Sequence, residues 1–450
     1  MPPASSLPAP SAGRSLRRAL GPWLLGILVV GDILGAGIYI LVGEVATEVG
    51  GLVWAPFVGA LALAALTVSS YAELVTAYPH AAGSAHWMQV AYRRETVSFL
   101  VGFAVAASAV STTAALSRAV GGQYLAAFVE APAEPVAVLV VLALAGICWV
   151  GIAESARANA AMTVAELSGL LIVVASGVGG ILAGDADWAR LTDSGTTEPG
   201  VPAFLAAVAL AFFAYLGFED AVHLAEEVRD PGRAFPRALY GGLAVVGVLY
   251  LAVTVSASVL VEADALATSE TPLLAVIDVG PFPVTDRLFA ALALLAVTNT
   301  ALIALTTASR QVYGLAEQGS IPPLLGRVGR RRTPGPAIVA VASVALVLAV
   351  TGGVRELADT TVVLLLGVFT MVNITVLVVR HRTGAQRPPG RRTPAAVPVL
   401  GAAGSAGLAV HALVTGGGAL VLRVGLLLGI GLVLHALAER NQLRRQREGR

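Results

Sequence analysis

The sequence predicts an all-α protein that spans a membrane about twelve times, because a helix needs about 20 apolar residues to cross the hydrocarbon layer. Its 450 residues are 56% hydrophobic and only 13% charged, with a mean hydropathy of +0.81. A soluble domain is nearer half apolar and a quarter charged. The apolar stretches are rich in Ala, Leu, Val and Gly, and none shows the alternation of a membrane β-strand. We therefore expect a polytopic membrane protein without a large soluble domain.

Each expected span is a long apolar run separated from the next by a short loop. The runs lie near residues 21–48, 51–78, 96–117, 135–151, 160–184, 202–226, 237–261, 286–310, 336–352, 359–379, 397–415 and 420–438. The first run is too long for a removed signal peptide and lacks the small-residue context of a cleavage site. It is therefore expected to remain as the first membrane helix.

The distribution of arginine supports this series of spans. All 29 basic residues are Arg, and alternating the loops between the two sides of the membrane places most of them on one side. The exceptions are Arg118, Arg190, Arg287, Arg355 and Arg423. Cytoplasmic loops carry such an excess of basic residues, so both termini are expected to be cytoplasmic.

Several enzyme classes are excluded by residues that the chain lacks. Without Lys it can have neither a Walker A phosphate loop nor a Schiff-base lysine. The single cysteine, Cys148, cannot form an intrachain disulfide or a cysteine-based metal site. None of the 6 histidines has a second His four residues away, so the HExxH pattern of a zinc protease is missing. We expect no enzymatic activity, no cofactor and no metal site.

The first span has glycines at its centre. Gly35 and Gly37 are flanked by Gly31 and Gly43, and each glycine weakens a helix by about 1 kcal/mol relative to Ala. Such a cluster favours a local break, which a bilayer tolerates only where the freed backbone groups face protein or a wet cavity. Close packing of helices is the alternative interpretation of the same glycines.

The sixth span is interrupted at a corresponding position. Gly217 lies in mid-span and is followed closely by Glu219 and Asp220. Segments 35–37 and 214–217 fall in the first helix of two consecutive five-helix blocks. Paired interruptions of this kind indicate an inverted-repeat transporter whose site lies between the broken helices.

Several motifs resemble those of amino acid permeases of the amino acid, polyamine and organocation superfamily. Gly35-Ala36-Gly37-Ile38-Tyr39 is similar to the signature of that family's first helix, and Phe212 to Glu219 is similar to its sixth helix. Further similar segments are Ala225 to Pro231 with Phe235-Pro236-Arg237, Tyr71 to Leu74 with Tyr78-Pro79 and Gly83-Ser84, Gly151 to Ala156 with Asn159, Ser309 to Tyr313 with Gly319 and Pro322, and Thr333-Pro334 with Pro336-Ala337. The resemblance covers most of residues 20–380 and comes closest to bacterial relatives of cationic amino acid transporters.

The resemblance implies a LeuT-type fold, in which two inverted repeats of five helices are followed by two further helices. Residues 21–184 would form the first repeat and residues 202–380 the second, with the two extra helices at 397–438. Residues 1–20 are expected to be a disordered cytoplasmic tail, and residues 439–450 an Arg-rich cytoplasmic tail.

The resemblance also implies that main-chain groups at the first break hold the carboxylate of a zwitterionic substrate. The donors would be the N–H groups near Gly35, Ala36 and Gly37. Free amides at the start of a half-helix, together with the positive end of its dipole, suit an anionic group.

The second break would supply acceptors for the substrate's ammonium group. These would be carbonyls near Phe213, Ala214 and Leu216, where the first half of the sixth helix ends. The side chains of Ile38, Phe213 and Phe218 are candidates for lining or closing the pocket. Ordinary packing or lipid contact is the alternative for the phenylalanines.

Ionisable side chains within the spans are candidates for coupling or gating, because each costs roughly 2.5–3.5 kcal/mol at mid-bilayer and tends to face a cavity. They are Asp32, Glu166, Glu219 and His223. In some proton-coupled relatives a Lys lies near the position of Glu166, and this mechanism cannot be carried over to a chain without Lys. Glu166 could instead carry a proton as a buried carboxyl or belong to a structural pair. His223, about one turn after Glu219, could share a proton with it or simply pack.

These observations predict a secondary active transporter that moves amino acids across the cytoplasmic (inner) membrane by alternating access, coupled to protons. The alternatives are an exchanger or uniporter of the same fold and, from another class, a small-solute channel, because broken helices also line ion filters. The expected partners are an amino acid, a proton and the lipid bilayer, with no nucleic acid. The sequence indicates neither which amino acid is carried nor the oligomeric state.

Overall fold

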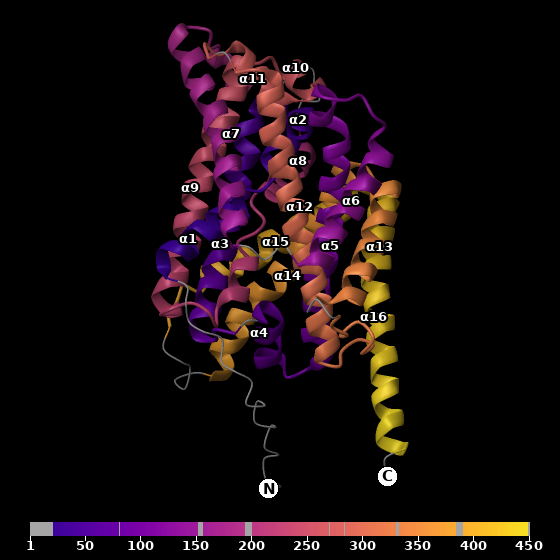
Figure 1. Ribbon diagram of the computed structural model, residues 1–450. Coiled ribbons are helices and arrows are strands. Elements are labelled where there is room, and N and C mark those ends of the chain that lie inside the picture. The colour runs from indigo at the N-terminus through magenta and orange to yellow at the C-terminus, as the bar shows by residue number, and fades with distance from the viewer. Residues whose placement is uncertain are drawn as a thin grey trace.

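In the computed structural model the described chain is helical, and no β-strand occurs among the described residues (Figure 1). These are residues 21–80, 82–151, 156–193, 200–269, 271–282, 284–329, 333–383 and 390–448. The predicted tail at residues 1–20 lies outside them, as do residues 449–450 of the predicted Arg-rich tail and residues 152–155 of one family-like segment. The all-α prediction is confirmed.

The helices follow one another along the chain with short connections. The α-helices are α1 (Pro22–Leu34), α2 (Gly37–Val49), α3 (Trp54–Ala77), α4 (Gly83–Tyr92), α5 (Glu95–Ala119), α6 (Ala133–Val150), α7 (Ala156–Ala183), α8 (Val201–Ala214), α9 (Pro231–Leu260), α10 (Ala263–Thr268), α11 (Pro272–Val279), α12 (Asp286–Glu317), α13 (Gly335–Thr351), α14 (Val354–Thr383), α15 (Ala396–Thr415) and α16 (Gly417–Glu448). Short turns of other helix types are η1 (Gly50–Val53), η2 (Val120–Tyr124), η3 (Leu125–Ala127), η5 (Trp188–Thr192) and η6 (Asp220–Leu224).

Most helices coincide with the expected spans, and local sequence explains where they begin and end. Pro22, Pro231 and Pro336 lie in the first turns of α1, α9 and α13, where proline sacrifices no hydrogen bond. α6 ends at Gly151, whose φ of 85° is the left-handed conformation that closes a helix.

The sixth predicted span is wrong in its second half. The span was expected to continue to residue 226, but α8 ends at Ala214, and the chain from there to 230 forms turns and the short η6. Gly217 has a φ of 123°, which a right-handed helix does not allow. Its amide donates to Glu219 Oε2 at 2.9 Å instead of to a carbonyl one turn back. An α-helix therefore cannot continue through Gly217.

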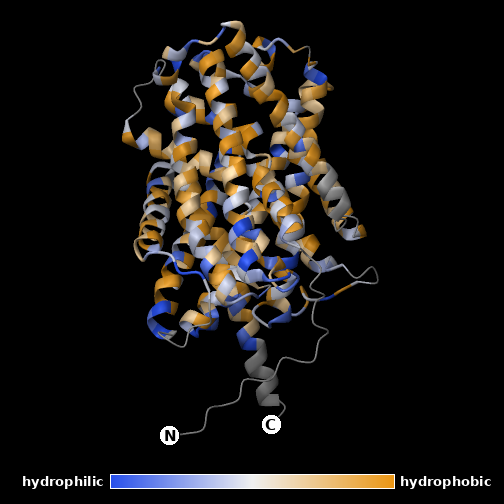
Figure 2. Cartoon of the chain, turned by 90° about the vertical axis from the view of Figure 1, so that its left-hand side faces the viewer, coloured by the Kyte–Doolittle hydropathy of each residue, from blue (hydrophilic) through white to orange (hydrophobic). Residues whose placement is uncertain are grey.

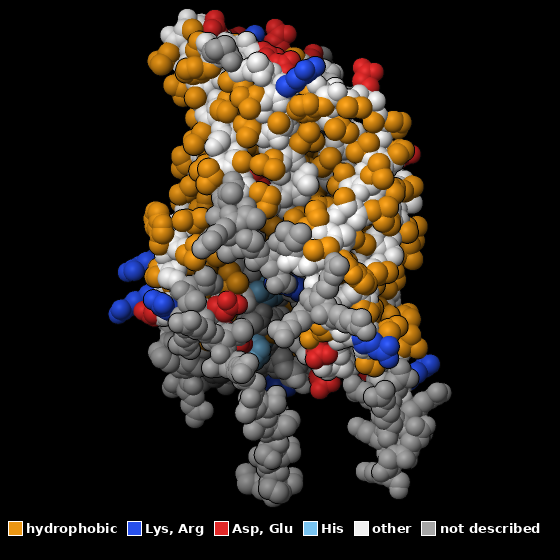
Figure 3. Space-filling model, viewed as in Figure 1, with side chains coloured by type: hydrophobic (Ala, Val, Ile, Leu, Met, Phe, Trp, Pro, Cys, Tyr) orange, Lys and Arg blue, Asp and Glu red, His pale blue; other side chains and the backbone are white. Residues whose placement is uncertain are grey.

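The polarity of the surface is that of a membrane protein. Nine ranges of the described chain are long and apolar enough to cross a membrane, by length and composition, and the first, Pro22–Ala77, runs through α1, α2, η1 and α3. The shorter α8 and α13 are also apolar. Apolar residues cover the sides of the bundle, and hydrophilic residues gather toward its ends (Figures 2 and 3). The chain is a polytopic membrane protein, as predicted, while the division into two inverted repeats stays a prediction.

The interrupted helices lie at the centre of the bundle. α2 is buried from Gly37 to Gly43, and α8 is buried from Ala207 to Ala214. α2 packs against α8, α1 packs against α9, and α5 packs against α12 and α14, whereas α16 lies at the edge (Figure 1). The break in the first span is therefore enclosed by protein.

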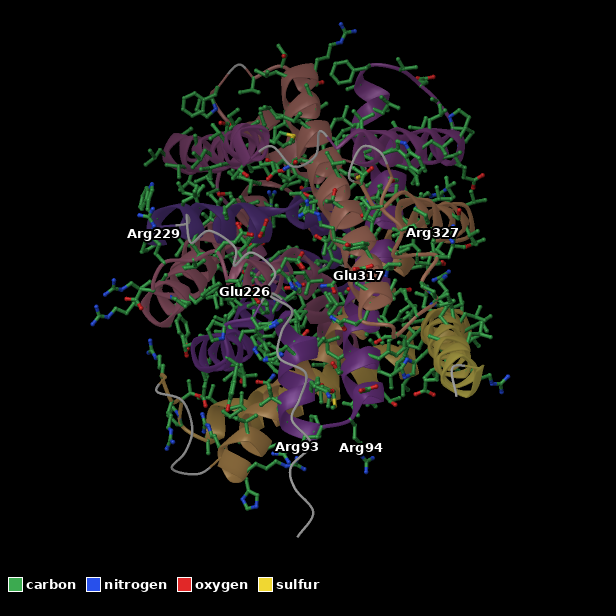
Figure 4. All side chains as sticks on the ribbon, turned by 60° about the horizontal axis from the view of Figure 1, so that its bottom comes forward. Arg93, Arg94, Glu226, Arg229, Glu317 and Arg327 are labelled. Carbon is green, nitrogen blue, oxygen red and sulfur yellow. The ribbon has the colours of Figure 1, made fainter. Side chains whose placement is uncertain are left out.

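The two ends of the bundle agree with the predicted arrangement of arginines. α4 lies at one end, and α10 and α11 lie at the other (Figure 1). Arg93, Arg94, Arg229 and Arg327 surround the α4 end, which comes forward in Figure 4. Arg355, one of the predicted exceptions, pairs at the opposite end with acidic residues of α2. Which end faces the cytoplasm stays a prediction.

Candidate functional site

The first interruption separates α1 from α2. α1 ends at Leu34, and Gly35 leaves the helical path with φ of −2° and ψ of 177°. α2 then begins at Gly37. A helix end leaves carbonyls without helical partners, and a helix start leaves amides without them, so polar main-chain groups of both kinds are freed in the middle of the bundle.

Two neighbouring helices supply partners for some of these freed groups. Tyr250 of α9 donates its hydroxyl to the carbonyl oxygens of Ile33 and Leu34, at 3.0 and 2.9 Å. Thr300 Oγ1 of α12 accepts a hydrogen bond from the Ala36 amide at 3.1 Å. The break is thus stabilised by side chains from α9 and α12.

The second interruption follows α8. The Tyr215 amide donates to the Phe212 carbonyl at 3.0 Å, and the Leu216 amide donates to the Phe213 carbonyl at 3.3 Å. These are bonds to the third residue back, which tighten and end the helix. Each carbonyl oxygen has two lone pairs, so the end of α8 keeps capacity to accept a further hydrogen bond.

The two interruptions are in direct main-chain contact. A Cβ atom added to Gly37 would lie 2.6 Å from the Cα of Ala214, and one added to Gly217 would overlap the carbonyl oxygen of Asp32. Only glycine leaves room for such an approach. Both interpretations of the glycines are therefore seen, with a helix break at Gly35 and close packing at Gly37 and Gly217.

A cavity with about 80 Å³ of space accessible to the centre of a water molecule lies where the two interruptions meet. Its wall is formed by α1, α5, α8, α12 and α14 together with the two interrupted segments. A water molecule needs roughly 10–15 Å³ of such space, so the cavity has room for a few water molecules in this conformation.

The wall of the cavity is acidic. Asp32, Glu219 and Asp220 lie on it, and no basic side chain occurs among the described residues of the wall. Hydroxyl groups of Ser108 and Thr112 from α5 add polar positions opposite the interruptions. In the described part of the chain no cluster of three or more His, Cys, Asp or Glu is placed to hold a metal ion. The arrangement suits an organic solute that carries a positive group.

Most residues predicted for the site lie on this wall. They are Gly35, Ala36, Gly37, Phe213, Ala214, Leu216, Asp32 and Glu219. The structure therefore brings the two predicted breaks together at one cavity. Binding of a substrate by these residues stays a prediction.

Two predicted lining side chains are placed away from the wall. Ile38 is fully buried in the core. Phe218 is also fully buried, with its ring 5.5 Å from that of Tyr71 and 5.3 Å from that of Phe369, measured between centroids. In this conformation both side chains pack the core.

Two coupling candidates also lie outside the wall. The Glu166 side chain of α7 accepts a hydrogen bond from Asn299 Nδ2 of α12 at 2.9 Å. His223 Nε2 lies 2.9 Å from Gln311 Nε2, also of α12. A proton shared between His223 and Glu219 stays a prediction.

Sequence reasoning missed the residues that α5, α12 and α14 contribute. Ser108, Thr112, Thr300 and Leu365 lie on the wall, and none of them was among the predicted site residues. Hydroxyl residues in the otherwise apolar spans were the available signal. One sequence does not fix which face of each helix points inward, so these positions could not be selected.

Comparison with known proteins agrees with this architecture. A family model described as amino acid permease matches residues 20–442. The chain belongs to the amino acid permease family. The resemblance drawn from the motifs is confirmed, and this family consists of transporters rather than enzymes.

Similar curated proteins differ in what their names say they carry. The vacuolar cationic amino acid transporter 2 of Arabidopsis thaliana is 28% identical over 84% of this chain and 62% of its own length. A branched-chain amino acid permease of Bacillus subtilis is 25% identical over 83% of each chain. A methylthioribose transporter of the same bacterium is 27% identical over 84% of this permease and 85% of its own length. The chain spans about three-fifths of the length of the plant relatives.

Proposed function

We propose that this permease carries amino acids across the cell membrane by alternating access, with the substrate held where the two interruptions meet. The observation that carries the proposal is the cavity formed by both breaks, with freed main-chain groups and carboxylates on one wall. An amino acid needs donors for its carboxylate and acceptors for its ammonium group. The two breaks offer both without a fixed basic side chain.

The proposed position of the substrate follows from these groups. Its ammonium group lies toward Asp32 and Glu219 and the carbonyls that end α8, because opposite charges attract strongly in a wall of low polarity. Its carboxylate lies toward the start of α2, where it competes with Thr300 for the Ala36 amide. Binding therefore exchanges an internal hydrogen bond for one to the substrate.

Alternating access fits the division of the first span into two half-helices. α1 and α2 are separate helices joined by Gly35 and Ala36, and in the proposal each moves against the rest of the bundle while the other stays in place. We propose proton coupling, with exchange or uniport in the same fold as alternatives. In the same proposal the protein lies in the cytoplasmic membrane with both termini inside, and residues 21–184 and 202–380 are the two repeats.

Transport by purified protein in proteoliposomes tests the proposal. Labelled amino acids are screened for uptake with and without imposed proton or sodium gradients, and then for counterflow against unlabelled amino acid. We expect saturable uptake that is accelerated by amino acid on the opposite side, which marks a carrier. Conductance without saturation would identify a channel and contradict the proposal.

A further inference from the structure

A pair of polar side chains, Glu166 and Asn299, is buried beside the interruptions and outside the cavity wall. Glu166 is 1% exposed and Asn299 is 3% exposed, and Asn299 Nδ2 donates to Glu166 Oε1 at 2.9 Å. The other oxygen of each group, Glu166 Oε2 and Asn299 Oδ1, is buried as well. In the described part of the chain neither of these two oxygens has a hydrogen-bond partner.

A single proton on the Glu166 carboxyl group would supply the donor that both unpartnered oxygens lack. An ionised carboxylate only accepts hydrogen bonds, and so does an amide oxygen, so the two atoms cannot satisfy each other while Glu166 is charged. A proton on Oε2 makes that atom a donor. A carboxylic acid and a carboxamide can then form two parallel hydrogen bonds, and no buried polar atom of the pair is left without a partner.

The surroundings of Glu166 also favour an uncharged carboxyl group. Asp32 of α1, Tyr39 of α2 and Tyr250 of α9 are, among the described residues, ionisable side chains near enough to interact with its charge, and none of these three carries a positive charge. Asn299 is the hydrogen-bond partner of the Glu166 side chain, and no ion pair involves Glu166 among the described residues. A buried carboxylate without a cation is very unfavourable in an apolar interior.

We infer that Glu166 and Asn299 form the proton-binding site of this permease, with Glu166 protonated in the conformation described here. The inference rests on the proposed function, in which transport is coupled to protons. It deepens that function by naming the residues that hold the proton. Loss of the proton leaves acceptor oxygens opposed across the contact between α7 and α12. Deprotonation therefore weakens the contact of these two helices at this point.

The proton-binding pair is connected to the first interruption by two routes. Thr300, the residue after Asn299 in α12, accepts the Ala36 amide at 3.1 Å. Tyr39, in the first turn of α2, donates its hydroxyl to the main-chain carbonyl of Glu166 at 2.7 Å. A shift of α7 against α12 therefore changes both the amide offered to the substrate carboxylate and the position of α2.

Infrared difference spectroscopy of the purified protein in lipid nanodiscs tests protonation directly. We expect a protonated-carboxyl C=O band that Glu166→Gln abolishes and that Asn299→Leu shifts, because the leucine removes the amide partner. Glu356→Gln, which changes an exposed carboxylate of α14, is the matched control and should leave the band unchanged. A spectrum in which Glu166→Gln removes no such band would overturn the inference, whatever the transport activity.

Transport in proteoliposomes tests the role of the proton. The measured quantity is the ratio of uptake with an inward proton gradient to uptake without one. We expect this ratio to fall to unity in Glu166→Gln and to keep its wild-type value in Glu356→Gln. A wild-type ratio in Glu166→Gln overturns the inference alone, whereas absence of counterflow in the wild-type protein overturns the proposed function. If Glu166→Gln does not fold, an unshifted band in Asn299→Leu overturns the inference.

Discussion

At the scale of single residues, three glycines near the cavity serve two structural purposes. Gly35 turns the chain out of the helix, while Gly37 and Gly217 allow two main chains to touch. The glycine cluster in the sequence predicted both a helix break and close packing of helices. It could not assign a task to each glycine, because the atoms that Gly37 and Gly217 contact belong to Ala214 and Asp32, which lie far away along the chain.

Gly217→Ala tests this contact. We expect the free energy of unfolding to fall by about 1–3 kcal/mol, as for a strained backbone position, because the added Cβ overlaps the Asp32 carbonyl and the φ of 123° disfavours alanine. Gly367→Ala in α14 is the matched control, since nothing lies within 4 Å of its added methyl group. Thermal unfolding of the purified variants gives the comparison, and equal melting temperatures would contradict the expected clash.

His86, in α4 outside the membrane spans, gives a prediction about pH. Burial, and then the His80 ring stacked 4.2 Å away, lower the pKa of His86 to about 4. Unfolded chains bind this proton near pH 6.5, so the folded state loses stability as pH falls from about 6.5 to 4 and keeps it above that window. Melting temperatures should therefore fall less steeply over this range in His86→Gln than in the wild type. Parallel pH profiles of the two proteins would show that His86 does not contribute.

At the scale of elements, the positions of the helices could be predicted from the sequence more accurately than their irregular ends. Apolar runs bounded by Pro, Gly and Arg were sufficient for most spans. They were not sufficient beyond Ala214, because residues 215–226 still contain many apolar residues, whereas the bonds between their main-chain amides and carbonyls reach only three residues back. Composition indicates which segments are buried, but it does not indicate which carbonyl each amide forms a hydrogen bond with.

A buried ion pair joins α3, α14 and the segment before α15. Glu73 is fully buried, and Arg380 Nε donates to its Oε1 at 2.8 Å. The Thr393 amide and hydroxyl both donate to Glu73 Oε2 at 3.0 Å. Three segments that are distant in sequence are thus fixed to one carboxylate.

Glu73→Gln should destabilise the protein by about 3–5 kcal/mol, because it leaves Arg380 without the carboxylate that compensates its charge. Glu356→Gln, which breaks the exposed pair with Arg423, should cost only about 0–1 kcal/mol. Chemical or thermal unfolding of both variants in the same detergent measures the two effects. Similar losses in the two variants would contradict a special contribution of the buried pair.

At the scale of the whole molecule, the class and the order of the spans could be predicted, because the hydrocarbon layer imposes length and polarity on every crossing. The family could be recognised from motifs at both breaks. The cavity could be predicted only in part, since its wall combines α1, α5, α8, α12 and α14. The inward faces of α5, α12 and α14 depend on how these helices pack, which one sequence does not determine.

The central claim is that an amino acid occupies the cavity between the two interruptions, and protection of an introduced cysteine tests it most directly. Ala109 lies on the wall, and the natural Cys148 can be replaced by Ser to give a cysteine-free background. In this background Ala109→Cys should react with a maleimide more slowly when a transported amino acid is present. Ala265→Cys, on the exposed surface of α10, should react at the same rate with and without it. Unchanged labelling of Ala109→Cys at saturating amino acid, in a variant that still shows counterflow, would contradict the claim.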